Sequence, residues 1–100
     1  MALSPLTSDP LLASELEIKN ILVVDDNAEV ANMLKILLES RDFVVTVVED
    51  GLSALKEVMD LNYDVILCDI EMPNMPGDML FLAVQKLKPA LAKRFIFVTG

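Results

Sequence analysis

Residues 21–26 read Ile-Leu-Val-Val-Asp-Asp, and this stretch decides the fold expected for the chain. A short apolar run ends abruptly in two acids. Residues 65–69, which read Val-Ile-Leu-Cys-Asp, end in the same way. Each run has the length and β-branched content of a buried strand. If the two strands are parallel neighbours, Asp25, Asp26 and Asp69 meet at one edge of the sheet, where open α/β sheets bind their ligands.

Strand and helix signals alternate along the chain around these two runs. Apolar, β-rich segments predict strands over residues 20–24, 43–48, 64–68 and 95–98. Helices are expected from the cap at Asn27 to about Ser40, from Asp50-Gly51 to about Asp60, and from the end of a loop over residues 72–77 to the stop at Pro89. The strands are apolar throughout and are separated by helices. This order predicts a parallel sheet covered on both faces, a three-layer α-β-α fold.

Each expected helix carries apolar residues at helical spacing, which we expect to face the sheet. They are Val30, Met33, Leu34, Leu37 and Leu38 in the first helix, Leu52, Leu55, Val58 and Met59 in the second, and Leu80, Phe81, Val84 and Leu87 in the third. Residues 1–19 are expected to be a lead-in, with a short helix over roughly 10–18 that Pro10 would begin.

Length and composition exclude several classes of protein. The 100 residues suffice for one domain, and 54% apolar content predicts a folded core. No apolar run approaches the roughly 18 residues of a membrane span, and no secretory signal is recognisable. A soluble, cytoplasmic protein is therefore expected. The net charge of −8 argues against binding nucleic acid through its phosphates.

The chemistry available to the chain is narrowed further by the side chains that it lacks. The sequence contains no His and a single Cys, Cys68. Catalysis by a Ser-His-Asp triad, zinc held by His and an intrachain disulfide are therefore excluded. Cys68 is expected to be a small buried hydrophobe. Three clustered carboxylates repel one another, so the acidic edge predicts a bound cation.

Three motifs in the same order resemble the receiver domain of two-component response regulators. They are the stretch 21–26, residues 64–77 (Asp-Val-Ile-Leu-Cys-Asp-Ile-Glu-Met-Pro-Asn-Met-Pro-Gly) and residues 95–100 (Phe-Ile-Phe-Val-Thr-Gly). The resemblance covers about residues 20–100, which would form the domain. It implies a flavodoxin-like fold that takes a phosphoryl group from the phosphohistidine of a histidine kinase, with Mg²⁺, and then switches conformation and output.

The resemblance also implies a role for each matching residue. Asp69 matches the phosphoacceptor. Asp26 and Asp69 match the direct ligands of Mg²⁺, and Asp25 matches the one that usually acts through water. Glu71 matches a position that offers its backbone carbonyl to the ion, and Thr99 matches a hydroxyl that hydrogen-bonds the phosphoryl group. Such a domain catalyses only its own phosphorylation and dephosphorylation and is not a turnover enzyme.

The partner that the resemblance implies is a histidine kinase or a phosphotransfer domain. The family pattern continues with a further helix, strand and helix, including a Lys that pairs with the phosphoryl group, whereas this sequence stops at Gly100. An incomplete receiver is therefore expected. Strand 95–98 would be an uncovered edge, which predicts a homodimer through this strand or through exchanged elements.

Several other interpretations remain open at this point. The acids could simply end strands and cap helices, and Thr99 could be an ordinary strand residue. A receiver-like module could bind partners without phosphorylation. A phosphatase of the haloacid-dehalogenase type also uses Asp and Mg²⁺, although it requires Asp-x-Asp where this chain has Asp69-Ile70-Glu71. A flavodoxin-like flavin protein shares the architecture but would need a phosphate-binding loop after its first strand.

Overall fold

A four-stranded parallel sheet forms the centre of the molecule. The computed structural model describes residues 18–72 and 75–98. The strands are β1 (Asn20–Val24), β2 (Val44–Val48), β3 (Val65–Asp69) and β4 (Phe95–Val98), in the spatial order β2-β1-β3-β4. All three pairings are parallel. The predicted parallel sheet is therefore confirmed, with β2 beginning one residue later than expected and β3 shifted by one residue toward the acids.

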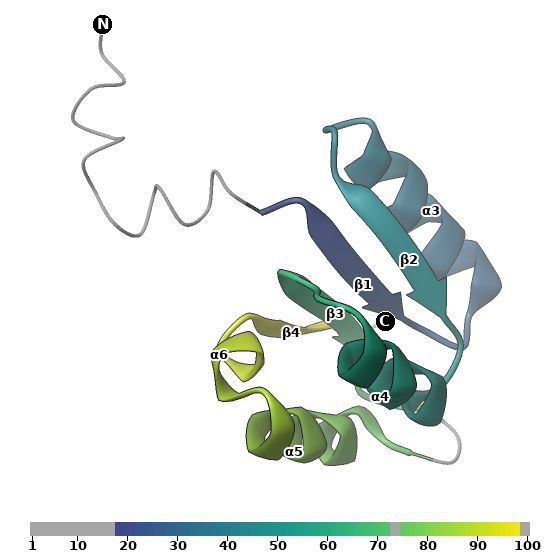
Figure 1. Cartoon of the computed structure of the whole chain (residues 1–100). Coiled ribbons are helices and arrows are strands. Elements are labelled where there is room, and N and C mark those ends of the chain that lie inside the picture. Colours follow the sequence, from purple (N-terminus) through teal and green to yellow (C-terminus); the bar gives the residue numbers. More distant parts are fainter. Residues whose placement is uncertain (1–17, 73–74, 99–100) are drawn as a thin grey trace, which may run out of the picture.

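Helices cover both faces of this sheet (Figure 1). The helices are α3 (Ala28–Glu39), α4 (Gly51–Asp60), α5 (Gly77–Leu87) and α6 (Pro89–Ala92). Figure 1 shows α3 on one face of the sheet and the other three helices on the opposite face. The predicted three-layer arrangement is confirmed. Among the described residues, no helix is both long enough and apolar enough to cross a membrane.

The apolar core is divided in two by the sheet, because successive residues of a strand point to opposite faces. Leu22 and Val24 of β1 belong to the cluster under α4, α5 and α6. Ile21 and Val23, which alternate with them, belong to the smaller cluster under α3. The uninterrupted apolar run of β1 thus serves two cores, which is why it lacks the alternation typical of a one-sided sheet.

The ends of the helices follow from local sequence. The Asn27 side chain accepts hydrogen bonds from the N–H groups of Glu29 and Val30 and caps α3, as predicted. Asp50 caps α4 by accepting from the N–H of Ser53 at 2.7 Å. Pro89 was expected only to end the third helix. It also begins α6, a short helix that the sequence analysis did not predict, because proline suits the first position of a helix.

The apolar stripes of the helices are narrower than the sequence predicted. Ala31, Ala54, Val58, Leu80 and Val84 are buried. Five positions that were expected to face the sheet are instead exposed, with 52–62% of their surface accessible: Met33, Leu37, Leu52, Met59 and Leu87. Each helix contacts the sheet along one side only, and positions at the margin of the stripe turn away from it. The expected helix over roughly 10–18 falls on residues that lie, apart from Ile18, outside those the structure describes.

The side chain of Asp64, just before β3, forms hydrogen bonds with the backbone at the start of β1. We expect replacement of Asp64 to destabilise the fold. Its Oδ2 accepts hydrogen bonds from the N–H of Asn20 at 2.8 Å and of Lys19 at 2.9 Å. The bond from Asn20, then that from Lys19 and the charge of Arg94, lower the pKa of Asp64 below its ordinary value of 3.8. At neutral pH, Asp64→Asn is expected to reduce the free energy of unfolding by about 1–2 kcal/mol in urea denaturation.

The pH dependence gives this prediction a second readout. Because the folded state lowers the pKa of Asp64, its contribution is complete above the ordinary value and is lost as the pH falls through the lowered one. The difference in stability between Asp64→Asn and the unaltered chain should therefore shrink in acid. Asp60→Asn, which changes an exposed acid at the end of α4, is the matched control. An equal loss of stability in both variants would contradict the role given to the two backbone bonds.

Candidate functional site

The three acids singled out in the sequence lie together at the carboxyl edge of the sheet. Val24 pairs with Cys68 in the β1–β3 register, so the next step along both strands brings Asp25 level with Asp69. A carboxylate oxygen from each of Asp25, Asp26 and Asp69 lies within 4.8 Å of the other two. The structure thus brings together the three side chains that the parallel arrangement predicted would meet.

Asp25 is the buried member of this cluster, with only 6% of its surface exposed. Its burial, followed by the charges of Asp69 and Asp26, raises its pKa above the ordinary value of 3.8. The N–H of Asn27, which donates to Asp25 Oδ1 at 2.8 Å, acts in the opposite direction. Asp26 is exposed and Asp69 is half-buried. The cluster is therefore open to solvent at Asp26, whereas Asp25 is buried beside two other negative charges.

The backbone after β3 orients the Asp69 side chain. The N–H of Glu71 donates to Asp69 Oδ1 at 3.2 Å. The sequence indicated a role only for the carbonyl of Glu71, because the residue type does not show which backbone N–H will form a hydrogen bond. Glu71 itself is exposed at the start of the loop that leads to α5. The expected ligand role of its carbonyl remains a prediction, and Thr99 lies outside the described residues.

Cys68, the neighbour of Asp69, takes no part in nucleophilic chemistry at this site. It is fully buried, as the sequence predicted. Burial, with the charges of Asp69 and Asp25, raises the pKa of its thiol to about 12. Because only the thiolate is a strong nucleophile, the neutral thiol is inert at physiological pH.

The donor set matches a hard divalent cation. Carboxylate oxygens are the ligands that Mg²⁺ prefers, and it commonly binds through one or two carboxylates with water and phosphate completing the shell. Burial is the main cause of the raised pKa of Asp25, and a cation between Asp25, Asp26 and Asp69 would relieve the repulsion that adds to it. With neither His nor a thiolate in the cluster, the residues do not favour softer metals.

Gly77 is a further residue of this site. It was expected to end the loop over the acidic edge, but α5 begins with it. Its N–H donates to the carbonyl of Ile70 at 2.9 Å. A Cβ atom at this position would lie 2.6 Å from the backbone oxygen of Asp69 and 3.0 Å from the Ile70 Cα. Only glycine therefore allows the start of α5 to approach the end of β3 this closely.

Gly77→Ala is accordingly expected to destabilise the fold and to disturb Asp69. Because the clash is with backbone, it cannot be relieved by turning a side chain, and the cost should be about 1–3 kcal/mol. Thermal denaturation measures the loss of stability, and titration with Mg²⁺ should show weaker binding. Asp78→Ala, at the next and exposed position, is the matched control. Wild-type stability in Gly77→Ala would contradict the close approach.

Comparisons with known proteins agree with this geometry. The family model of the response regulator receiver domain matches residues 21–100. The sensor kinase/phosphatase CqsS of Vibrio cholerae is 44% identical over 68 residues, 68% of this chain and 10% of that protein. The DNA-binding response regulator MtrA of Mycobacterium tuberculosis is 44% identical over 59 residues, 59% of this chain and 26% of that protein. The chain thus spans a small part of these relatives.

Solved structures show the same fold. The chemotaxis response regulator CheY4 of Vibrio cholerae matches with a TM-score of 0.74 and 26% identity, over 80% of this chain and 67% of that one. The response regulator TrrA of Thermotoga maritima, solved in complex with Mg²⁺-BeF, matches with a TM-score of 0.70 and 33% identity, over 82% of this chain and 68% of that one. With its acidic cluster at the carboxyl edge of a β2-β1-β3-β4 sheet, the chain belongs to the response regulator receiver domain family.

Proposed function

We propose that this receiver domain is the phosphoacceptor of a two-component phosphorelay, with Asp69 as the modified residue. The donor is the phosphohistidine of a histidine kinase or of a phosphotransfer domain. The observation that carries this proposal is the convergence of Asp25, Asp26 and Asp69 within 4.8 Å at the carboxyl edge. The domain modifies itself and, through the change that follows, regulates an output. It acts on no separate substrate.

In the proposed transfer, a carboxylate oxygen of Asp69 attacks the phosphorus atom of the phosphohistidine. A phosphorus–oxygen bond forms, the phosphorus–nitrogen bond breaks, and its electron pair stays on the imidazole nitrogen. Oδ1 accepts the N–H of Glu71, so we assign the attack to Oδ2. Asp25, Asp26 and Asp69 would hold Mg²⁺, with the Glu71 carbonyl as a further ligand. When bound, Mg²⁺ offsets the negative charge of the phosphoryl oxygens.

One relative adds support for the metal. TrrA of Thermotoga maritima, to which this chain is 33% identical, was solved with Mg²⁺-BeF. A hydrogen bond from Thr99 to the phosphoryl group remains part of the proposal. We also propose residues 20–100 as the receiver unit, residues 1–19 as its lead-in, and the cytoplasm, where histidine kinases expose their phosphohistidine, as its location.

The test is the mass of the intact protein after incubation with a phosphorylated phosphotransfer domain and Mg²⁺, with a small acyl phosphate as a second donor. One added phosphoryl group is expected with Mg²⁺ and none with a chelator. No gain from either donor would overturn the proposal. That outcome would favour the alternative, a receiver-like module that binds its partners without phosphorylation.

A homodimer through β4 is a separate part of the proposal. Within the described residues β4 lies at the edge of the sheet, and Ile96 has 51% of its surface exposed. An apolar edge strand with unpaired backbone groups favours pairing with another chain. Size-exclusion chromatography with light scattering should show a dimer for this chain and a monomer for Ile96→Lys. A monomer that persists at high concentration without the substitution would contradict it.

A further inference from the structure

A hollow at the amino edge of the sheet, opposite the acidic cluster, has no part in the proposed phosphotransfer. Its volume is about 470 Å³, within the range of ligand-binding pockets. Its lining comes from the loop before β3, from the turn into α6 and α6 itself, and from the residue before β4: Asn62, Tyr63, Asp64, Lys88, Pro89, Ala90, Leu91 and Arg94.

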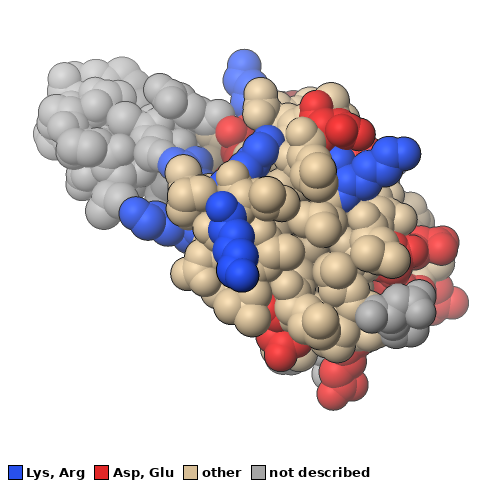
Figure 2. All heavy atoms as spheres, turned by 60° about the horizontal axis from the view of Figure 1, so that its bottom comes forward, with Lys and Arg blue, Asp and Glu red and all other residues tan. Residues whose placement is uncertain are grey.

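One wall of this hollow carries a charge opposite to that of the whole chain. The protein carries 16 acidic and 8 basic residues, yet residues 79–98 contain four of the basic residues and no acidic one. The four are Lys86, Lys88, Lys93 and Arg94, and all lie from the end of α5 to the start of β4. Figure 2 shows Lys and Arg gathered toward one side of the molecule, with Asp and Glu mostly along the opposite rim.

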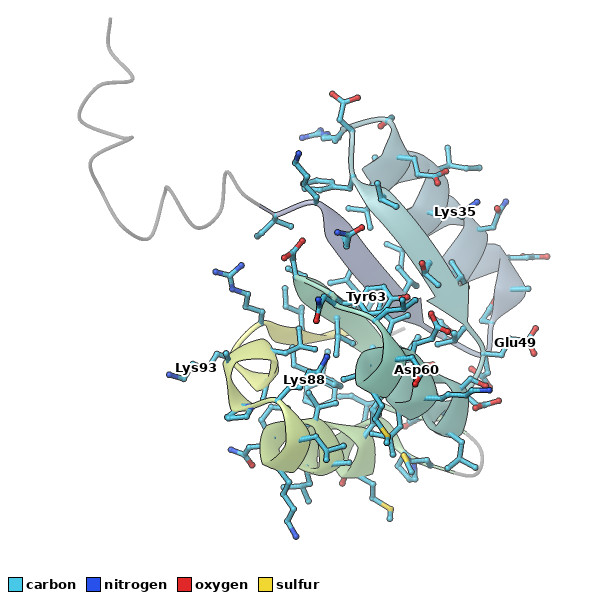
Figure 3. The ribbon with its side chains drawn as sticks, in the orientation of Figure 1. Lys35, Glu49, Asp60, Tyr63, Lys88 and Lys93 are labelled. Atoms are coloured by element: carbon cyan, nitrogen blue, oxygen red, sulfur yellow. The ribbon has the colours of Figure 1, made fainter. Side chains whose placement is uncertain are left out.

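The acidic side chain that lines the hollow, Asp64, offsets part of this charge, because it interacts with the charge of Arg94. The Oδ2 of Asp64 accepts two backbone N–H groups, and the charge of Arg94 helps to lower its pKa. Lys88 donates to the carbonyl of Leu61 at 3.2 Å, which uses one of its three protons. In Figure 3, Lys88 lies between the Tyr63 loop and α6, whereas Lys93 points away from the body of the molecule.

Apolar surface accompanies the positive charge. Leu61 and Leu87, the neighbours of lining residues, have 54% and 52% of their surface exposed. Leu91 forms the buried floor, and together with Ala92 it anchors α6 to the core. The hollow is therefore preformed, so a ligand would not have to order its walls. Aromatic and aliphatic surface with a polar rim is typical of a protein-binding site.

We propose that this hollow docks an acidic peptide segment of a partner protein, with an aliphatic or aromatic side chain in the hollow and carboxylates beside Lys88 and Lys93. Charge complementarity selects this occupant. A nucleic acid fits less well, because the space between the cations is lined by Tyr63, Pro89 and Leu91 and the chain carries a net charge of −8. The hollow and Asp69 lie at opposite edges of the sheet, so docking and phosphotransfer can occur together.

The test uses the full chain and a fluorescein-labelled synthetic peptide that has a Leu-Phe centre flanked by acidic residues. Fluorescence anisotropy should show binding that weakens with added salt, and weaker binding of the matched peptide with amides in place of the acids. The double variant Lys88→Gln/Lys93→Gln should lower the affinity about fivefold to tenfold. Lys35→Gln on α3, which leaves the hollow intact, should not. Equal affinity for both peptides, or an equal loss in Lys35→Gln, would overturn the proposal.

A second variant and NMR mapping of the binding site distinguish a specific loss of peptide binding from a loss caused by misfolding. Ala90→Glu places a carboxylate in the hollow at an exposed position in the first turn of α6, where an acid is compatible with the helix. It should abolish binding with an unchanged melting temperature. Amide NMR signals of residues 61–64 and 88–94 should shift on binding, and those of residues 25 and 69 should not. Shifts centred on the acidic edge would refute this location.

The chain's own acids near the N-terminus provide the competing explanation. Asp9, Glu15 and Glu17 precede β1, and residues 1–17 contain no basic side chain. Replacing the three by their amides in the full chain should leave the affinity for the probe peptide unchanged. A rise of several fold would mean that this segment already occupies the hollow, and would overturn the assignment to a partner.

Discussion

Asp69→Asn is expected to abolish phosphoryl uptake, lowering the labelled fraction by at least about a hundredfold under conditions where the unaltered chain gains one group. An amide has the same size and similar hydrogen-bonding capacity but is a very weak nucleophile toward phosphorus. The Glu71 N–H can still donate to the amide oxygen, so the loop should keep its position. The readout is the intact mass after incubation with Mg²⁺ and a small acyl phosphate.

Two controls separate loss of the acceptor from loss of structure. Asp78→Asn changes an exposed acid at the start of α5 and should leave uptake unchanged. The melting temperature of metal-free Asp69→Asn should equal or exceed that of the unaltered chain, because one of the mutually repelling charges is gone. Hydroxylamine should remove the group from the labelled protein, since it cleaves acyl phosphates. Undiminished labelling of Asp69→Asn would place the acceptor elsewhere.

Mg²⁺ is expected to raise the melting temperature by roughly 10–20 °C at a concentration about 100-fold above its dissociation constant. Binding to the folded state alone contributes about 2.7 kcal/mol at that concentration, and each kcal/mol corresponds to about 4–8 °C for a domain of this size. The three carboxylates attract the ion, and its charge also relieves the repulsion among Asp25, Asp26 and Asp69. Thermal denaturation monitored by circular dichroism, with and without a chelator, measures the shift.

Asp25→Asn should make the metal-free protein more stable and should weaken its stabilisation by Mg²⁺. Burial raises the pKa of Asp25, so the folded state holds the proton more tightly than the unfolded one. Stability without metal therefore falls as the pH rises from the ordinary value of 3.8 through the raised pKa, and then stays at its lower level. Asp25→Asn removes this loss, so the metal-free variant should melt higher than the unaltered chain at neutral pH.

With Mg²⁺ the order of stabilities should invert, because the variant lacks one of the carboxylates. Its melting temperature is expected to rise much less on addition of the ion. Glu49→Gln changes an exposed acid after β2 that is not part of the cluster, and it should respond to Mg²⁺ as the unaltered chain does. An equal response in Asp25→Asn would exclude Asp25 from the ion's surroundings.

The strand and helix order was predictable from the sequence because its signals are local. The runs that became β1 and β3 are apolar throughout, and Asn27 and Asp50 cap the helices that follow them by bonds within three residues. The meeting of Asp25 and Asp69 was predictable as well. It depends only on both acids ending parallel, adjacent strands, and the register bears this out.

The helix faces were predicted less well. An apolar residue at helical spacing does not reveal whether its neighbour in space is a strand or solvent. Met33 and Leu52 fit the expected stripes but point away from the sheet, while the smaller Ala31 and Ala54 make the close contacts. Short side chains let a helix approach a sheet, and a count of large apolar residues misses them.

By itself, the sequence determined a parallel α/β domain and three acids at one edge of its sheet, because apolar runs, caps and strand ends act over a few neighbouring residues. Only the tertiary structure decided which contacts position the two edges of the sheet. The N–H of Glu71 on Asp69, the approach of Gly77 to the end of β3, and the bond of Lys88 to Leu61 each depend on the folded path of the chain. The hollow beside Tyr63 has the same origin, since residues 62–64 and 88–94 become neighbours only when α5 folds back beside α4.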